Sequence, residues 1–133
     1  MYLKNSNRQN SKPINILIVD DHEAIGAGLV KLGEFNEKLN FVGICKTKNE
    51  LEDFLKKQVP DIIIMDISLG KHDGIEITKE ILEKLPDIKV VIYSIDCHIG
   101  IVQRAIRSGA SGFFFKIFRH PFFISGTRKF AEK

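Results

Sequence analysis

The sequence predicts an α/β fold in which one parallel sheet is covered by helices on both faces. Short apolar segments of strand length alternate along the chain with segments of helical length, as in βαβ units. The strand segments are apolar at successive positions, which is typical of strands with both faces buried. The chain has 133 residues, a length that fits a single domain with its own core.

The first half of the chain supplies two strands and two helices. We expect strands at residues 14–19 and 39–45, and helices at about 23–36 and 48–58. The inward face of the first helix is expected to carry four apolar side chains: Ile25, Leu29, Leu32 and Phe35. Glycines within that helix weaken it, so packing against the sheet must support it. The second helix is amphipathic and ends before Pro60.

The second half supplies three strands separated by two helices. The expected order is strand 61–66, helix 75–84, strand 88–94, helix 98–108 and strand 112–116. A loop from Gly70 to Gly74 precedes the first of these helices, and Gly109 follows the second as its C′ residue. The five strands of the two halves therefore make one sheet.

The charge distribution divides the chain into three parts. Residues 1–13 form a polar arm expected to be flexible, 14–116 form the folded domain, and 117–133 form a tail rich in phenylalanine. The formal net charge is +3, but 14–116 contains 13 basic and 16 acidic residues, so the basic excess belongs to the arm and the tail. Direct nucleic-acid binding by this chain is therefore not expected.

The sequence also favours a cytoplasmic protein. The N-terminal residues lack the apolar stretch of a signal peptide, and no apolar run approaches the ~20 residues that span a bilayer. The two cysteines and four histidines show neither redox nor zinc-site spacing, which favours reduced thiols and no zinc site. We expect no membrane association.

Polar side chains follow the predicted strands at the point where each strand ends. Asp20 and Asp21 follow the first strand, while Asp66, Ser94 and Lys116 end the third, fourth and fifth strands. Because the carboxyl ends of parallel strands lie at one edge of a sheet, these groups are expected to meet there. Each acid alone has a structural interpretation, such as Asp21 capping a helix. Their joint occurrence at the same edge favours a functional site.

The chemistry of these groups is that of phosphoryl transfer. Neighbouring carboxylates repel one another unless a cation lies between them, and oxygen ligands of this kind suit Mg²⁺. A lysine and a hydroxyl can bind phosphoryl oxygens. A carboxylate can act as the nucleophile and form an aspartyl phosphate.

Four segments resemble the receiver domain of response regulators, the CheY-like variant of the flavodoxin-like fold. These segments are LIVDDH (17–22), DIIIMDISLGKHDGIE (61–76), VVIYS (90–94) and AIRSGASGFFFK (105–116). Asp-Asp-His after the first strand and Gly-Ala-x-Gly before the fifth resemble the NarL/LuxR subgroup. The resemblance covers 14–116 and implies a doubly wound five-stranded parallel sheet of order 2-1-3-4-5.

The resemblance also implies the role of each metal and phosphoryl ligand. Asp66 would be the phosphoacceptor and would take its phosphoryl group from a sensor histidine kinase or a small acyl phosphate. Asp20, Asp21, Asp66 and the backbone carbonyl of Ser68 would hold Mg²⁺, and Lys116 would pair with the phosphoryl group. Such a domain is not a metabolic enzyme, although it assists its own phosphorylation and dephosphorylation.

The implied switch lies on the fourth helix and fifth strand of the fold. Ser94 would move toward the phosphoryl group and draw the following loop inward. Phe113 stands where the family often places a tyrosine, so it can fill the same space without the hydroxyl's hydrogen bond. A plain structural role for Phe113 is an equal alternative.

The tail departs from the family pattern. Residues 117–133 are expected to form a short or atypical fifth helix, because Gly126 and Thr127 interrupt the pattern and no sustained apolar stripe is present. Exposed phenylalanines favour a partner surface, so we expect a homodimer through this C-terminal region. The 17 residues after Lys116 cannot hold the DNA-binding helix-turn-helix module that NarL/LuxR regulators carry.

Three alternatives to a phosphorylation-controlled receiver remain open at this stage. The chain could be a phosphorylation-independent interaction module, or a remnant of a truncated DNA-binding regulator. It could also be an Mg²⁺-dependent phosphatase with an aspartate nucleophile. Phosphatases of that type usually place their nucleophile on the first strand, with a second aspartate two residues on, whereas Asp20 and Asp21 are adjacent.

Overall fold

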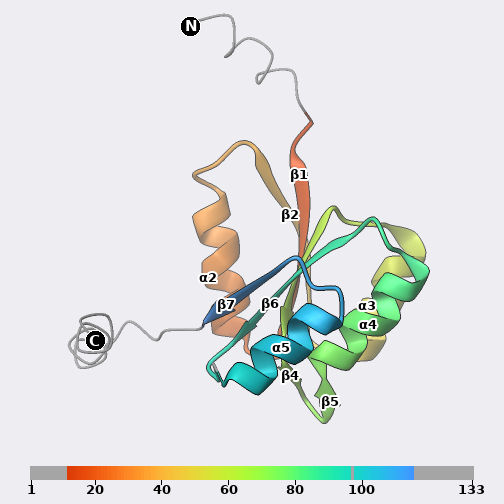
Figure 1. Ribbon diagram of the computed structural model, residues 1–133. Coiled ribbons are helices and arrows are strands. Elements are labelled where there is room, and N and C mark those ends of the chain that lie inside the picture. Colours follow the sequence, from red (N-terminus) through yellow and green to blue (C-terminus); the bar gives the residue numbers. More distant parts are fainter. Residues whose placement is uncertain (1–11, 97, 116–133) are drawn as a thin grey trace, which may run out of the picture.

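A computed structural model describes residues 12–96 and 98–115, and Figure 1 shows its elements. Strands and helices alternate along the chain as the sequence predicts. The order is β1 (Ile14–Val19), α2 (Glu23–Gly33), β2 (Leu39–Cys45), α3 (Lys48–Lys57), β3 (Ile62–Asp66), β4 (Ser68–Leu69), β5 (His72–Asp73), α4 (Gly74–Lys84), β6 (Lys89–Ser94), α5 (Ile99–Arg107) and β7 (Gly112–Phe115). Each predicted strand and helix within the described residues is found at nearly the expected position.

Five strands form one parallel sheet of order β2-β1-β3-β6-β7. Counting only these strands, this is the predicted order 2-1-3-4-5, and the predicted fold class is confirmed. A short antiparallel pair, β4 with β5, lies outside the main sheet, where the sequence predicted only a loop. Gly70 makes the turn between these strands with φ of +60°, a conformation that glycine adopts readily.

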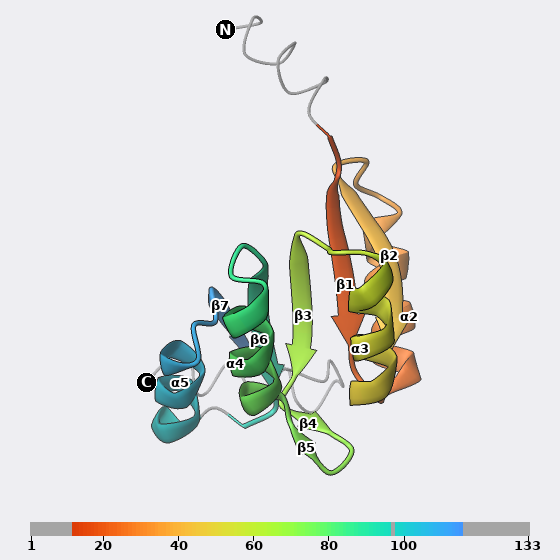
Figure 2. The ribbon, with the colours of Figure 1, turned by 90° about the vertical axis from the view of Figure 1, so that its right-hand side faces the viewer.

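Three helices, α3, α4 and α5, cover one face of the sheet (Figure 2). The main core lies between them and the strands. It is formed by buried side chains of β1, β3 and β6, among them Leu17, Met65 and Ile92, packed against residues of the helices such as Leu51 and Ile77. Burial of these apolar side chains is the main stabilising term of the fold.

Helix α2 packs on the opposite face of the sheet through only part of the apolar face that its spacing predicts, since Ile25 and Leu29 are half-buried but the other two residues are not. Leu32 is 68% exposed and Phe35, beyond the end of the helix, is 83% exposed. Glycines make the close contacts instead: a Cβ at Gly33 would overlap the Phe41 ring of β2. The periodicity of large apolar residues missed these contacts because the closest approach needs residues without a side chain.

The ends of two helices have the expected capping chemistry. The Thr47 hydroxyl accepts a hydrogen bond from the backbone N–H of Glu50 at the start of α3, at 3.1 Å. The carboxylate of Asp73 caps α4 by accepting from the N–H of Ile75, at 2.8 Å. Gly109 follows α5 with φ of +96°, which confirms its predicted C′ position.

Several predictions fall on residues that the structure does not describe. The arm (1–11), Lys116 and the tail (117–133) lie outside the described residues, and so does the predicted fifth helix.

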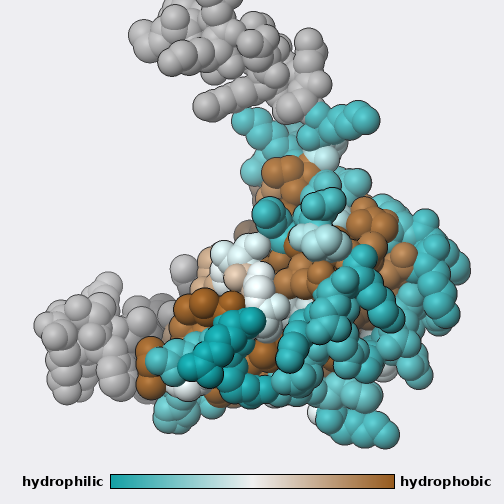
Figure 3. Space-filling model, turned by 45° about the vertical axis from the view of Figure 1, so that its right-hand side comes forward, coloured by the Kyte–Doolittle hydropathy of each residue, from teal (hydrophilic) through white to brown (hydrophobic). Residues whose placement is uncertain are grey.

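Apolar side chains gather in a band between hydrophilic surfaces on the face shown in Figure 3. Among the described residues, no helix is both long enough and apolar enough to span a membrane.

Candidate functional site

Strand register places the predicted site residues at one edge of the sheet. Val19 of β1 pairs with Met65 of β3, so Asp20 and Asp66 come next to each other at the ends of these strands. Asp66 in turn pairs with Tyr93 of β6. The arrowheads of β1 and β3 point toward the end of the molecule where β4 and β5 project (Figure 2).

Three carboxylates and one imidazole meet at this edge. One ligand atom from each of Asp20, Asp21, His22 and Asp66 can be chosen so that all four lie within 4.8 Å of one another. Asp20 is 0% exposed and Asp66 is 3% exposed, whereas Asp21 lies on the surface. Two of the three carboxylates are therefore largely removed from solvent, where their mutual repulsion is screened least.

Asp21 does not cap helix α2, which was its structural alternative. The N-cap position of α2 is occupied by His22, whose side chain makes no capping hydrogen bond. The Asp21 carboxylate instead accepts a hydrogen bond through Oδ2 from the N–H of Gly70, at 3.2 Å. This contact links the turn between β4 and β5 to the carboxylate cluster.

His22 belongs to the cluster, although the sequence analysis assigned it no role. Its Nδ1 lies 2.9 Å from Asp20 Oδ1, 3.0 Å from Asp21 Oδ1 and 3.7 Å from Asp66 Oδ2. Its backbone N–H also donates to Asp20 Oδ1, at 2.8 Å. Its position directly after two site aspartates was the available signal.

Tyr93 is a second contributor that the sequence analysis did not assign. Its hydroxyl donates a hydrogen bond to Oδ2 of Asp20, and both side chains are buried. Tyr93 lies on β6 and Asp20 follows β1, so the bond crosses the intervening strand β3. Sequence pattern identified Tyr93 only as a strand residue, because nothing in the local sequence indicates a partner 73 positions away.

The main chain around Asp66 is tightly held. Its Oδ1 accepts a hydrogen bond from the N–H of Ser68, at 3.2 Å. The N–H of Gly74, the first residue of α4, donates to the carbonyl oxygen of Ile67, at 2.6 Å. The start of α4 therefore packs directly on the backbone that carries Asp66.

The other predicted residues are placed less completely. Ser94 ends β6, is 5% exposed, and its Oγ accepts a hydrogen bond from the N–H of Asp96, at 2.9 Å. Phe113 lies on β7, partly buried and packed against the main core. Ser68 is exposed on β4, and Lys116 lies outside the described residues.

An ion pair connects α5 to the start of α4. Arg104 Nη2 donates to Asp73 Oδ2 at 2.6 Å, and this hydrogen bond raises the pKa of the guanidinium above its usual value. The other oxygen of Asp73 caps α4. Helix α5 is thereby linked to β5, and the turn between β4 and β5 contacts Asp21 of the carboxylate cluster.

The donor set of the cluster fits a hard divalent cation. Asp20, Asp21 and Asp66 offer carboxylate oxygens, the ligands that Mg²⁺ prefers, and Mg²⁺ is usually held by few carboxylates together with water. A cation would also offset the repulsion between the buried carboxylates. The cluster is therefore suited to a hard divalent cation such as Mg²⁺.

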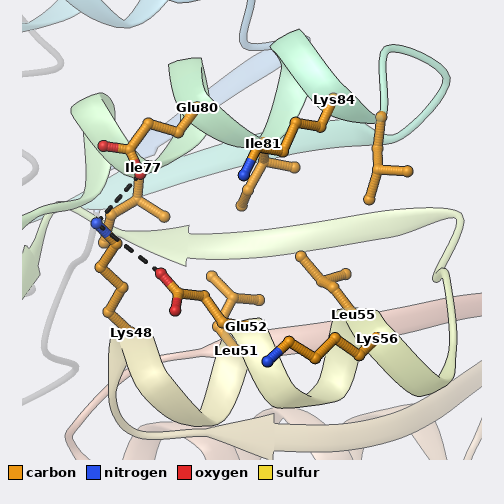
Figure 4. A pocket seen from close by; sticks show the side chains of 10 residues that line it. Lys48, Leu51, Glu52, Leu55, Lys56, Ile77, Glu80, Ile81 and Lys84 are labelled. Atoms are coloured by element: carbon orange, nitrogen blue, oxygen red, sulfur yellow. Dashed lines mark ion pairs between the residues drawn. The ribbon is translucent and has the colours of Figure 1, made fainter.

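The groove between α3 and α4 is separate from this site (Figure 4). Its volume is about 390 Å³ and its floor is apolar. Lys48 bridges its rim through ion pairs with Glu80 at 3.1 Å and Glu52 at 4.0 Å. It shares no lining residue with the carboxylate cluster.

A parallel sheet of this order, with aspartates gathered at its carboxyl edge, defines the receiver class of α/β domains. Residues 16–124 match the response regulator receiver domain, and the chain belongs to that family. Receiver domains act in two-component signalling, where sensor histidine kinases regulate them, and they are typically not enzymes. This membership does not favour the phosphatase alternative.

Relatives include NarL/LuxR-type regulators, in line with the predicted subgroup. The chain is 30% identical over 107 residues to the transcriptional regulatory protein DegU of Brevibacillus brevis, covering 80% of this chain and 45% of that protein. It is 32% identical over 104 residues to the response regulator protein VraR of Staphylococcus saprophyticus, covering 78% and 50%. The chain thus spans about half the length of these relatives.

Solved structures show the same architecture. The isolated receiver domain of RcsB from Salmonella enterica, determined with the phosphomimetic BeF3⁻, superposes with a TM-score of 0.73 at 25% identity, covering 79% of this chain and 78% of that one. The signal receiver domain of the response regulator NarL from Mycobacterium tuberculosis has a TM-score of 0.75 at 20% identity, covering 92% and 98%. The second likeness concerns the fold alone.

Proposed function

We propose that this domain accepts a phosphoryl group on Asp66 and that Mg²⁺ is held beside it by Asp20, Asp21, Asp66 and the carbonyl of Ser68. The observation that carries the proposal is the meeting of the three carboxylates at the carboxyl edge of a receiver sheet. The phosphoryl donor is a phosphohistidine of a sensor histidine kinase, or a small acyl phosphate.

Asp66 is the nucleophile of the transfer. One of its carboxylate oxygens forms a bond to phosphorus while the bond from phosphorus to the donor nitrogen or oxygen breaks, and the donor leaves with those electrons. The hydrogen bond from the N–H of Ser68 to Oδ1 fixes the rotation of the carboxylate. The Tyr93 hydroxyl and the N–H of His22 hold Asp20 in the same way. When bound, Mg²⁺ neutralises the charge that develops on the transferred group.

The phosphorylated state would be recognised by Ser94 and Lys116. A phosphoryl group adds nearly two negative charges and new acceptor oxygens beside Asp66. In the structure, the Ser94 hydroxyl accepts a hydrogen bond from the N–H of Asp96. If Ser94 turned toward the phosphoryl group, this hydrogen bond would break and the loop before α5 would shift. Phe113 of β7 would follow this change, which makes the surface of α5 and β7 the output surface.

The same proposal includes the partners of the domain and its location in the cell. The domain would work in the cytoplasm with a sensor histidine kinase, and its own phosphorylation and dephosphorylation would be assisted by the site residues. The tail (117–133) would contact a second copy of the chain and give a homodimer. Direct binding of nucleic acid by this chain is not part of the proposal.

Labelling with acetyl phosphate tests the proposal. The wild-type chain should gain the mass of one phosphoryl group only when Mg²⁺ is present, and Asp66→Asn should gain none. Asp87→Asn is the matched control, because Asp87 is exposed and outside the cluster, and it should be labelled like the wild type. Undiminished labelling of Asp66→Asn would show that another residue is the phosphoacceptor.

A further inference from the structure

The imidazole of His22 lies where three carboxylates converge. Its Nδ1 is 2.9 Å from an oxygen of Asp20, 3.0 Å from an oxygen of Asp21 and 3.7 Å from an oxygen of Asp66. The backbone N–H of His22 donates to Asp20, which fixes the residue at the start of α2. Its ring is not used to cap the helix, so Nδ1 is directed at the cluster.

The spacing of these atoms matches the coordination sphere of a single ion. Neighbouring ligands of an octahedral ion with bonds near 2.1 Å lie about 3.0 Å apart, and opposite ligands about 4.2 Å apart. The contacts of Nδ1 with Asp20 and Asp21 have the first spacing, and its distance of 3.7 Å to Asp66 lies between the two. A neutral imidazole has one N–H, which cannot serve three surrounding carboxylates equally, whereas one cation can.

Asp20 is held so that one of its oxygens remains directed at this group. Its Oδ2 accepts from the Tyr93 hydroxyl, while its Oδ1 is the atom nearest to His22 Nδ1. The buried carboxylate therefore presents a fixed oxygen beside the nitrogen. The result is a mixed donor set of oxygen and nitrogen rather than oxygen alone.

We infer that His22 Nδ1 is a metal ligand and that it shifts the ion preference of this site from Mg²⁺ toward transition-metal ions. This inference rests on the metal site of the proposed function. Imidazole nitrogen binds Co²⁺, Ni²⁺ and Zn²⁺ readily, whereas Mg²⁺ takes oxygen ligands and keeps its water. A nitrogen donor therefore adds affinity for the first group and adds little for Mg²⁺. His22 is thus the residue that determines metal specificity.

Metal titrations of the untagged full chain test the inference. Isothermal titration with Mg²⁺ and with Co²⁺ is carried out on the wild type, His22→Ala and His72→Ala. We expect His22→Ala to weaken Co²⁺ binding about tenfold or more and to change Mg²⁺ binding less than about twofold. His72 is an exposed histidine of β5 outside the cluster, so its variant controls for general loss of an imidazole.

Spectroscopy of the Mn²⁺-loaded chain identifies the ligand directly. The electron spin-echo signal should show coupling to an imidazole nitrogen in the wild type and in His72→Ala, and none in His22→Ala. Binding of Mg²⁺ and Co²⁺ without that coupling and with unchanged selectivity in His22→Ala would overturn the inference while leaving the proposed function intact. Tighter binding of both ions by His22→Ala would also overturn it, because His22 would then be a competitor of the metal. Failure of the wild type to bind either ion would instead refute the metal site of the proposed function.

Discussion

Replacement of Gly74 by alanine should destabilise the domain strongly, because the start of α4 rests on the backbone of Asp66, the proposed phosphoacceptor. A Cβ at Gly74 would overlap the carbonyl oxygen of Asp66 and would lie 2.9 Å from its carbonyl carbon and 3.0 Å from the Cα of Ile67. All three are backbone atoms, so no rotation of a side chain can relieve the overlap. Either the end of β3 or the start of α4 must move.

The expected cost follows from that overlap. Inserting a methyl group into a well-packed region typically costs ~1–3 kcal/mol, and rigid backbone neighbours place this site at the upper end. Alanine also lowers the conformational entropy of the unfolded chain, which offsets roughly 0.5–1 kcal/mol of this loss of stability. A net loss of about 2 kcal/mol is therefore expected.

Gly28→Ala is the matched control within helix α2. Nothing lies within 4 Å of the position that its Cβ would occupy, so alanine should stabilise the domain by roughly 0.5–1 kcal/mol. Urea unfolding followed by circular dichroism should thus move the midpoint down for Gly74→Ala and up for Gly28→Ala. A Gly74→Ala midpoint at or above the wild-type value would refute the assigned contact between α4 and the backbone of Asp66.

Two further predictions concern buried polar groups. Tyr93→Phe removes the hydroxyl that donates to the buried Asp20 carboxylate, so unfolding in urea should show a loss of about 1.5–3 kcal/mol; wild-type stability would show that this bond contributes nothing. Burial, with a smaller effect from the negative charge of Glu50, raises the pKa of Cys45 to about 11. In a Cys97→Ser background, iodoacetamide should therefore label Cys45 very slowly at pH 8 and faster only as the pH approaches 11, as followed by mass spectrometry. Rapid labelling at pH 8 would contradict this thiol environment.

The regular elements could be predicted because their signals are local. The apolar run of β1 and the Pro60 that follows α3 indicate the type or the end of an element from a few neighbouring residues. Crossovers between parallel strands are right-handed, which leaves few possible strand orders. The inward face of α2 was predicted only in part, because periodicity also includes Leu32 and Phe35, which are exposed, whereas glycines such as Gly33 make the closest contacts with the sheet. The pattern of apolar residues does not indicate where a close contact between helix and sheet requires glycine.

The site was predictable only in part, for a related reason. Asp20 and Asp66 could be placed together because parallel strands end at one edge, and the structure brings them together. Tyr93 could not be connected to Asp20, since that contact depends on the orientation of one side chain across the sheet. The proposed roles of Ser94 and Lys116 stay predictions.

The order of the strands has a consequence for how the carboxylate cluster is assembled during synthesis. The sheet is built from parallel pairings between distant segments, and Tyr93 meets Asp20 across 73 positions. Pairing of this kind forms late, because the entropy cost of closing a long loop comes before the paired strands stabilise the chain. A nascent chain that ends before β6 already contains all three acids, yet it lacks the strand that holds Asp20. If the proposed function holds, competence for phosphorylation should therefore arise only once β6 has joined the sheet and Tyr93 holds Asp20.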